Sequence, residues 1–217
     1  MIEHVYRRAA AATTIARVIV ATDDRRIFDA VERFGGEAVM TSAAHQSGTD
    51  RLAEAAAALD CDLVVNVQGD EPVLAAETID AAVAPFTAAA DLEMSTLRRR
   101  IVDAAELHNP NVTKVVVDRE GFAMYFSRAP IPFTRAGQPA APAWAHIGLY
   151  VYRRATLLRI AALPQTATER GEALEQLRPL EYGIRIKAIE TAHEPIGVDT
   201  REDLERVRAL LAHVTTT

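Results

Sequence analysis

The sequence has a single cysteine, Cys61, and no long apolar run. One cysteine cannot form an internal disulfide, and it excludes a metal cluster built on several cysteines. Because Cys61 lies beside a predicted strand, we expect a small buried side chain rather than a nucleophile. No run approaches the roughly 18 apolar residues of a membrane span. The first residues also lack the apolar core and cleavage pattern of a signal peptide, so the cytoplasm is the expected compartment.

A basic stripe is missing as well. Lys+Arg 24 against Asp+Glu 30 gives a net charge of -6, so the phosphate backbone of a nucleic acid is not an expected partner. We find neither an internal repeat nor a low-complexity linker. The chain has 217 residues, of which 49% are hydrophobic and 25% charged. That is ordinary globular composition and enough chain for one substantial core, so we expect a single domain over residues 1–217.

Helical and strand patterns alternate over the first part of the chain. Strands are predicted over residues 17–21, 37–41, 64–68 and 92–99, each preceded by a helical segment. Such alternation indicates right-handed crossovers and a mostly parallel sheet with helices on both faces. The fold class expected from the pattern is therefore α/β.

The middle of the chain has a different character. Residues 113–133 form two strand patterns around the turn Asp118–Gly121, a Pro-rich segment follows, and residues 143–154 are a further strand. We expect a small antiparallel β layer inserted at about residues 113–152, a usual form of a dimer arm or substrate lid. Helices over 154–163, 168–183 and 200–214 and a strand over 184–191 complete the chain.

The stretch VVNVQGDEP, residues 64–72, combines a β-branched apolar run with an abrupt polar end. This pattern is typical of a buried parallel strand that opens into a loop at its carboxyl end. In open α/β sheets, ligands bind beyond the carboxyl ends of the strands. Asp70 and Glu71 therefore lie where a metal or a phosphate would bind, although a simple polar turn gives the same pattern.

A second carboxylate, Asp199, follows another strand and directly precedes a helix. Mg²⁺ prefers one or two carboxylates together with phosphate oxygens and water. Asp70 and Asp199, from distant parts of the chain, would supply such a pair between strand ends. The alternative for Asp199 is a helix N-cap.

The loop at residues 43–51 leads into a helix and carries Ser47, Gly48 and Thr49. Its backbone N–H groups and hydroxyls are suited to a nucleobase or a phosphate. A Gly-Thr pair before a helix is also an ordinary cap, so this loop alone does not distinguish the two interpretations.

Polar side chains also occur within the second half of the chain. His146 shares one strand face with Trp144, Gly148 and Tyr150, where it could contact a sugar hydroxyl or a carboxylate or simply belong to the core. Glu175 and Gln176 lie beside Arg178 in a predicted helix, where most such polar sets are solvated.

These segments together resemble the 3-deoxy-manno-octulosonate cytidylyltransferases, the CMP-Kdo synthetases of Gram-negative bacteria. The motifs that carry the resemblance occur in the family's order: HQSGTDRLAE, VVNVQGDEP, LHNPNVTKVVVDREGFAMYFSRAPIP, HIGLYVYR, LEQLRPLEYG and GVDTREDLERVR. The resemblance runs along essentially the whole chain, and QGDEP, HQSGT and GVDT separate it from sugar nucleotidyltransferases in general.

The resemblance implies a Rossmann-like three-layer sandwich of the nucleotide-diphospho-sugar transferase type. It implies transfer of a cytidylyl group from CTP to 3-deoxy-manno-octulosonate (Kdo), giving CMP-Kdo and pyrophosphate for lipopolysaccharide biosynthesis. By resemblance, Asp70 and Asp199 hold Mg²⁺ and are catalytic, and Ser47 and Gly48 lie at the cytosine. The residues that would line the Kdo pocket are Gln68, Arg128, His146, Tyr150, Glu175 and Gln176. The inserted β layer makes a homodimer the expected assembly.

One departure from the family pattern concerns the beginning of the chain. The family opens with a further strand and a basic loop of the form PARxxSxRLPGKPL, which holds the CTP triphosphate, and these residues lack both. Arg7 and Arg8 lie inside a predicted helix without the glycines that bring a backbone close to phosphate. We therefore expect a natural start further upstream and low stability and activity of these 217 residues alone. A non-catalytic nucleotide-binding or dimerising protein, and a cytidylyltransferase for another acidic sugar, remain the alternatives.

Overall fold

The computed structural model describes residues 1–45, 47–193, 196–198 and 200–214. Its first half alternates helices and strands as the sequence predicts. The helices of this half are α1 Ile2–Ala10, α2 Arg25–Arg33, α3 Gly48–Ala57, α4 Ala76–Val83 and α5 Pro85–Ala88. Its strands are β1 Val20–Thr22, β2 Ala38–Met40, β3 Leu63–Asn66 and β4 Met94–Arg100.

The second half contains the hairpin and the returning α/β pattern. Its strands are β5 Lys114–Val117, β6 Ala123–Ser127, β7 Trp144–Arg153 and β8 Ile186–Glu190. Its helices are α6 Ala104–His108, α7 Arg154–Ala161, α8 Ala167–Glu172, α9 Leu177–Glu181 and α10 Arg201–Val214. The single helix predicted over residues 168–183 is two helices, because Ala173 adopts a left-handed backbone conformation with φ 51°.

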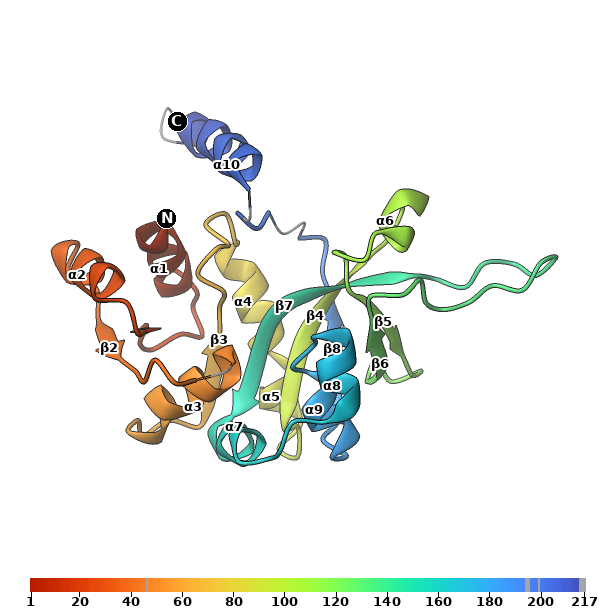
Figure 1. Ribbon diagram of the computed structural model, residues 1–217, viewed down its shortest axis with the longest axis horizontal. Coiled ribbons are helices and arrows are strands. Elements are labelled where there is room, and N and C mark those ends of the chain that lie inside the picture. The colour runs from red at the N-terminus through yellow and green to blue at the C-terminus, as the bar shows by residue number, and fades with distance from the viewer. Residues whose placement is uncertain (46, 194–195, 199, 215–217) are drawn as a thin grey trace.

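Strand β7 lies inside the main sheet, between β3 and β4 (Figure 1). It runs antiparallel to both, whereas β4 and β8 pair in parallel, so β3, β4 and β8 share one direction. The α/β class is confirmed, but the sheet is mixed rather than mostly parallel. The reason is that β7 returns from the hairpin region and enters the sheet in the opposite direction.

Strand β3 is hydrogen bonded along one side, to β7, and among the described residues no ladder joins it to β1. Strand β1 pairs in parallel with β2 in a separate two-stranded sheet. All four residues of β3 are half-buried, and the strand runs antiparallel to its partner β7, so the prediction of a buried parallel strand is wrong in both respects. Cys61, just before β3, is also half-buried rather than enclosed.

The predicted hairpin is confirmed as β5 and β6, joined by a turn at Asp118 to Gly121. It is continuous with the main sheet, because Lys114 at the start of β5 pairs with Ala145 of β7. Strand β7 within the predicted layer thus belongs to the central sheet. The chain between β6 and β7 forms a long extension away from the body of the molecule (Figure 1). Its use as a dimer arm stays a prediction.

Two apolar clusters cover the two faces of the sheet. Ile147, Leu149 and Val151 of β7 pack with α1, α4 and α5, whereas Tyr152 faces the cluster formed with α3, α7 and α9. This alternation confirms the three-layer arrangement. In the part of the chain that the structure describes, no helix has both the length and the apolar character needed to cross a bilayer. The cytoplasmic location stays a prediction.

A buried ion cluster joins α3, α8 and α9. Arg178 of α9 donates to the Glu169 carboxylate of α8, with Nη2 at 2.6 Å from Oε1, and its Nη1 lies 3.5 Å from Asp50 of α3. The side chains of Arg178 and Glu169 are each only 3% exposed. The cluster therefore fixes the α8–α9 connection, residues 173–176, against the beginning of α3.

Replacing Arg178 with Met should lower the free energy of unfolding by about 3–5 kcal/mol, because the Glu169 carboxylate would stay buried without its partner. Urea denaturation followed by circular dichroism measures the change. Arg7→Ala is the control, since its pair with Glu3 is exposed and should contribute less than about 1 kcal/mol. A loss no larger for Arg178→Met than for the control would contradict a buried Glu169 carboxylate that depends on Arg178 as its partner.

Candidate functional site

The QGDEP loop follows β3 and contacts the segment that leads to α10. The backbone N–H of Val198 donates to the C=O of Asp70 over 3.0 Å. Asp199 itself lies outside the described residues, but the residue directly before it is hydrogen bonded to the predicted metal ligand. The two predicted motifs thus converge at one edge of the molecule. Among the described residues there is no cluster of three or more His, Cys, Asp or Glu side chains that would hold a metal alone.

Glu71 is a second carboxyl group in this loop. Burial, with a smaller contribution from the neighbouring Asp70, raises the pKa of Glu71 to about 7. Part of the Glu71 population is therefore protonated at neutral pH, which reduces the negative charge of the loop.

The N-terminus of α3 brings together two predicted groups of site residues. The Glu175 carboxylate accepts from the backbone N–H groups of Gly48, at 3.3 Å, and Thr49, at 3.1 Å, and from the Thr49 hydroxyl at 2.6 Å. Ser47 acts as the N-cap, since its hydroxyl accepts from the N–H of Asp50. The helix end is already occupied by a carboxylate, which would repel a phosphate, so the arrangement favours a nucleobase.

His146 and Tyr150 form an aromatic cluster on one face of β7. The His146 ring lies 5.4 Å from the Tyr150 ring and 5.0 Å from that of Phe126, and its Nε2 lies 2.9 Å from the Thr96 hydroxyl. Burial lowers the pKa of His146 to about 3. Burial, with Tyr152 and Glu175 nearby, raises the pKa of Tyr150 well above its usual value. Both side chains are therefore uncharged at neutral pH and able to hydrogen bond.

Gln68 and Gln176 lie at the borders of this cluster. The Gln68 side chain is exposed, and its amide nitrogen lies 3.5 Å from the C=O of Gly148 in β7. Gln176 is buried and directly follows Glu175 in the connection between α8 and α9. Glu175 and Gln176 thus lie outside the helix in which the sequence pattern placed them.

Arg128 has a structural arrangement different from that of the other predicted Kdo residues. Its guanidinium donates to the backbone carbonyls of Glu172, at 2.8 Å, Pro110, at 3.1 Å, and Ala173, at 3.4 Å. The buried ammonium of Lys114 in turn donates to the C=O of Arg128 over 2.6 Å. Arg128 therefore connects the hairpin to the α8–α9 connection, and within the described residues no hydrogen bond joins it to His146 or Tyr150.

Sequence reasoning missed two neighbours of His146 on β4. Thr96 contacts the ring directly, and Arg98 is the Cα partner of His146 in the β4–β7 ladder. Strand alternation places Thr96 and Arg98 on one face of β4. The local sequence does not show which strand lies beside β4, and so it does not show which residues this face contacts.

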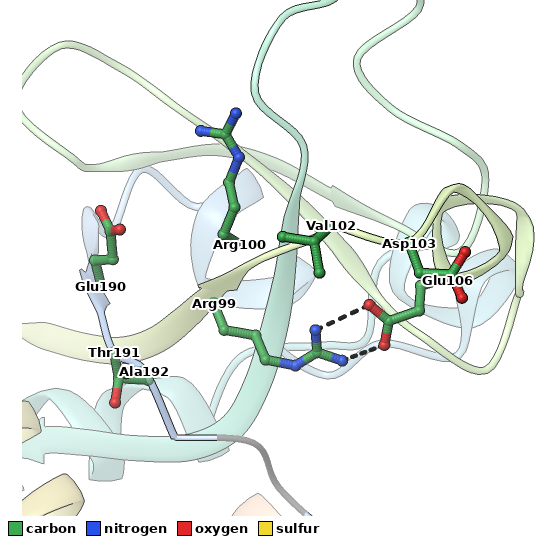
Figure 2. Close-up of a pocket in the computed structure, with 8 residues that line it drawn as sticks. All are labelled: Arg99, Arg100, Val102, Asp103, Glu106, Glu190, Thr191 and Ala192. Atoms are coloured by element: carbon green, nitrogen blue, oxygen red, sulfur yellow. Dashed lines mark hydrogen bonds and ion pairs between the residues drawn. The ribbon is translucent and has the colours of Figure 1, made fainter.

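One pocket, of about 580 Å³, lies at the carboxyl ends of β4 and β8 and contains none of the predicted site residues (Figure 2). Its lining residues are Arg99, Arg100, Val102, Asp103, Glu106, Glu190, Thr191 and Ala192. Arg99 and Glu106 pair with each other across one side (Figure 2). Because charges of both signs line it and partly neutralise one another, the pocket does not select a ligand of one charge.

Comparison with known proteins shows what the chain is similar to. A family model of cytidylyltransferases matches residues 1–187. The 3-deoxy-manno-octulosonate cytidylyltransferase of Solibacter usitatus is 51% identical over 210 residues, covering 97% of this chain and 83% of the relative. That of Syntrophotalea carbinolica is 53% identical over 219 residues, covering 97% of this chain and 88% of the relative.

Solved structures also superpose on nearly the whole chain. A CMP:2-keto-3-deoxy-manno-octonic acid synthetase in complex with CTP superposes with a TM-score of 0.92 at 43% identity, covering 98% of this chain and 87% of that one. A 4-diphosphocytidyl-2C-methyl-D-erythritol synthase from Anaerococcus prevotii superposes with a TM-score of 0.64 at 15% identity, covering 97% of this chain and 88% of that one. The second likeness concerns the fold alone.

His146→Gln should make the protein less sensitive to acid. Between about pH 6.5 and pH 3 the unfolded chain binds a proton at residue 146 that the folded chain does not, because the pKa of His146 is lowered to about 3. Stability from this source is therefore present above about pH 6.5 and lost as the pH falls. Thermal midpoints at pH 7 and pH 5 should differ less in His146→Gln than in the unmodified protein. The exposed His108, replaced by Gln, is the control; the same acid-induced drop in all three proteins would contradict the neutral buried state.

Proposed function

The chain belongs to the family of 3-deoxy-manno-octulosonate cytidylyltransferases, and we infer that it transfers the cytidylyl group of CTP to Kdo, releasing pyrophosphate and forming CMP-Kdo. The observation that carries this inference is the likeness to the CTP-bound synthetase, which extends over 98% of the chain with a TM-score of 0.92. We further propose that the product serves lipopolysaccharide biosynthesis.

In the proposed reaction, the anomeric hydroxyl of Kdo attacks the α-phosphorus of CTP and pyrophosphate leaves. Catalysis of this type depends on holding the two reactants in line and on neutralising phosphate charge. Mg²⁺ would be held by Asp70 and Asp199, and it supplies that charge neutralisation when bound. The carboxylate of Asp70 and the hydrogen bond between its C=O and Val198 fit such a site, since they bring two oxygen-bearing segments to one edge.

The other site residues hold and orient the sugar in this proposal. The uncharged His146 and the protonated Tyr150 can hydrogen bond to sugar hydroxyls without adding charge. Glu175 is fixed by Gly48 and Thr49, so its carboxylate links the sugar side of the site to the loop proposed for cytosine. These contacts position Kdo and CTP relative to each other rather than transferring protons.

Asp70→Asn and Asp199→Asn should each lower turnover by at least about 100-fold, because removal of a metal ligand weakens charge neutralisation by several kcal/mol. Pyrophosphate release by the full-length protein with CTP, Kdo and Mg²⁺ measures this, and EDTA should abolish the activity of the unmodified protein. Asp91→Asn, an exposed carboxylate before β4, is the matched control.

Normal turnover in either variant would remove that residue from the metal site. Pyrophosphate release by the unmodified protein with a sialic acid or an amino analogue of Kdo, but not with Kdo, would replace the proposed substrate. CTP binding without any turnover would favour a non-catalytic protein.

We also propose a homodimer formed through the hairpin and its extension. Large apolar side chains are exposed in this region: Val102 at 88%, Met124 at 62% and Phe133 at 88%. Val102 precedes α6, Met124 is in β6 and Phe133 is in the extension between β6 and β7. These elements lie on the same side of the molecule (Figure 1). Exposed apolar residues gathered in one region are typical of an interaction surface.

Phe133→Asp should raise the dimer dissociation constant at least about 10-fold, because a charge would replace a large apolar side chain in the contact. Light scattering after size-exclusion chromatography over a concentration series gives the value. Tyr182→Asp changes an exposed aromatic residue at the end of α9 and should leave the assembly unchanged. A monomeric unmodified protein at all concentrations would contradict the proposal.

A further inference from the structure

Arg98 extends from β4 onto the face of the sheet that carries His146. Its guanidinium carbon lies 4.2 Å from the centre of the Trp144 ring, and Trp144 precedes His146 by two residues on β7. Thr96, two residues before Arg98, contacts the His146 ring. Residues two apart on a strand share a face, so Arg98 lies on the same side of the sheet as His146 and Tyr150.

The guanidinium of Arg98 is incompletely hydrogen bonded within the described residues. Its Nε and Nη1 are buried and have no hydrogen-bond partner in the described part of the chain, and the whole side chain is only 14% exposed. Its third nitrogen, Nη2, lies 4.0 Å from the Glu190 carboxylate, a distance at the limit of an ion pair and too long for a hydrogen bond. Burial lowers the pKa of Arg98, but an arginine stays charged in proteins.

Buried N–H groups are almost always hydrogen bonded, so two open donors on one rigid guanidinium indicate a missing acceptor. The fork of N–H groups matches the two oxygens of a carboxylate. Stacking on Trp144 keeps the guanidinium plane in place, which reduces the entropy lost when a ligand binds. An anionic group with two acceptor oxygens is therefore the complementary ligand.

We propose that Arg98 binds the carboxylate of the acidic sugar, beside the cluster of His146 and Tyr150. This assignment rests on the proposed function. Arg128, the other arginine considered for the Kdo site, has its guanidinium engaged with three backbone carbonyls, whereas two buried nitrogens of Arg98 lack a hydrogen-bond partner among the described residues. Arg98 is a specificity residue in this role: it selects a sugar acid over a neutral sugar and holds it beside the aromatic cluster.

The test compares Arg98→Met with the unmodified full-length protein. Met keeps an unbranched side chain over Trp144 but removes both donors and the charge. The KM for Kdo should rise about 10- to 100-fold, the effect of losing a hydrogen bond to a charged group, while the KM for CTP stays unchanged. Arg98→Lys, which keeps the charge without the fork, should give an intermediate KM. The matched control is Arg100→Met, since Arg100 is exposed and lies 5.4 Å from the same ring.

A second measurement uses the substrate. The unmodified protein should strongly prefer Kdo over its carboxamide. Arg98→Met should lose most of this preference, because the pair between Arg98 and the Kdo carboxylate is already absent in the variant. If the unmodified protein turns over Kdo and Arg98→Met retains its KM and its discrimination, the role of Arg98 is refuted and the proposed function stands. Equal rises of both KM values with a lower thermal midpoint would show a structural residue and also refute it. An unmodified protein that is inactive with Kdo would refute the proposed function, and the assignment of Arg98 with it.

Discussion

The insertion of β7 between β3 and β4 is the constraint on which the rest of the structure depends. Both sides of this strand are hydrogen bonded, so its register with each neighbour is fixed. A slip of one residue would move Ile147, Leu149 and Val151 out of the core. The same slip would remove His146 and Tyr150 from the opposite face. Core packing and the sugar side of the proposed site are therefore determined by one pairing.

The buried Arg178 cluster positions the α8–α9 connection more than it stabilises the fold. Taking two charges out of water costs several kcal/mol, and their attraction roughly offsets this, so an apolar replacement of the whole cluster would fold comparably well. An apolar cluster, however, would not fix the orientation of the α8–α9 connection relative to α3. The pair with Glu169, together with Asp50, anchors both ends of the connection that carries Glu175. Glu175 consequently reaches the N-terminus of α3 from more than a hundred residues away in the chain.

Local patterns in the sequence were sufficient for most elements and for several site residues. The last helix is an example, since the helix predicted over residues 200–214 is observed as α10, Arg201–Val214. The position of β7 in the sheet was not predictable, because alternation specifies which residues share a face but not which strand lies beside them. For the same reason Arg98 and Thr96 were missed. The break at Ala173 was hidden as well, since alanine strongly favours the right-handed helix and only tertiary contacts hold it elsewhere.

The charge of the two proposed substrates explains why two arginines near the site are used so differently. CTP and a sugar acid are both anions, and the chain itself has a net charge of -6, so they meet only where local positive charge is available. The charge of Arg128 is held against carbonyl oxygens and acts mainly on the backbone. Arg98 carries its charge in a poorly solvated position, with two buried nitrogens that lack a partner among the described residues, and there water weakens the attraction to an anion least. A buried cation without a protein partner is unfavourable in the empty site, and a bound anion stabilises it. The site therefore favours a sugar that carries a carboxylate over one that does not.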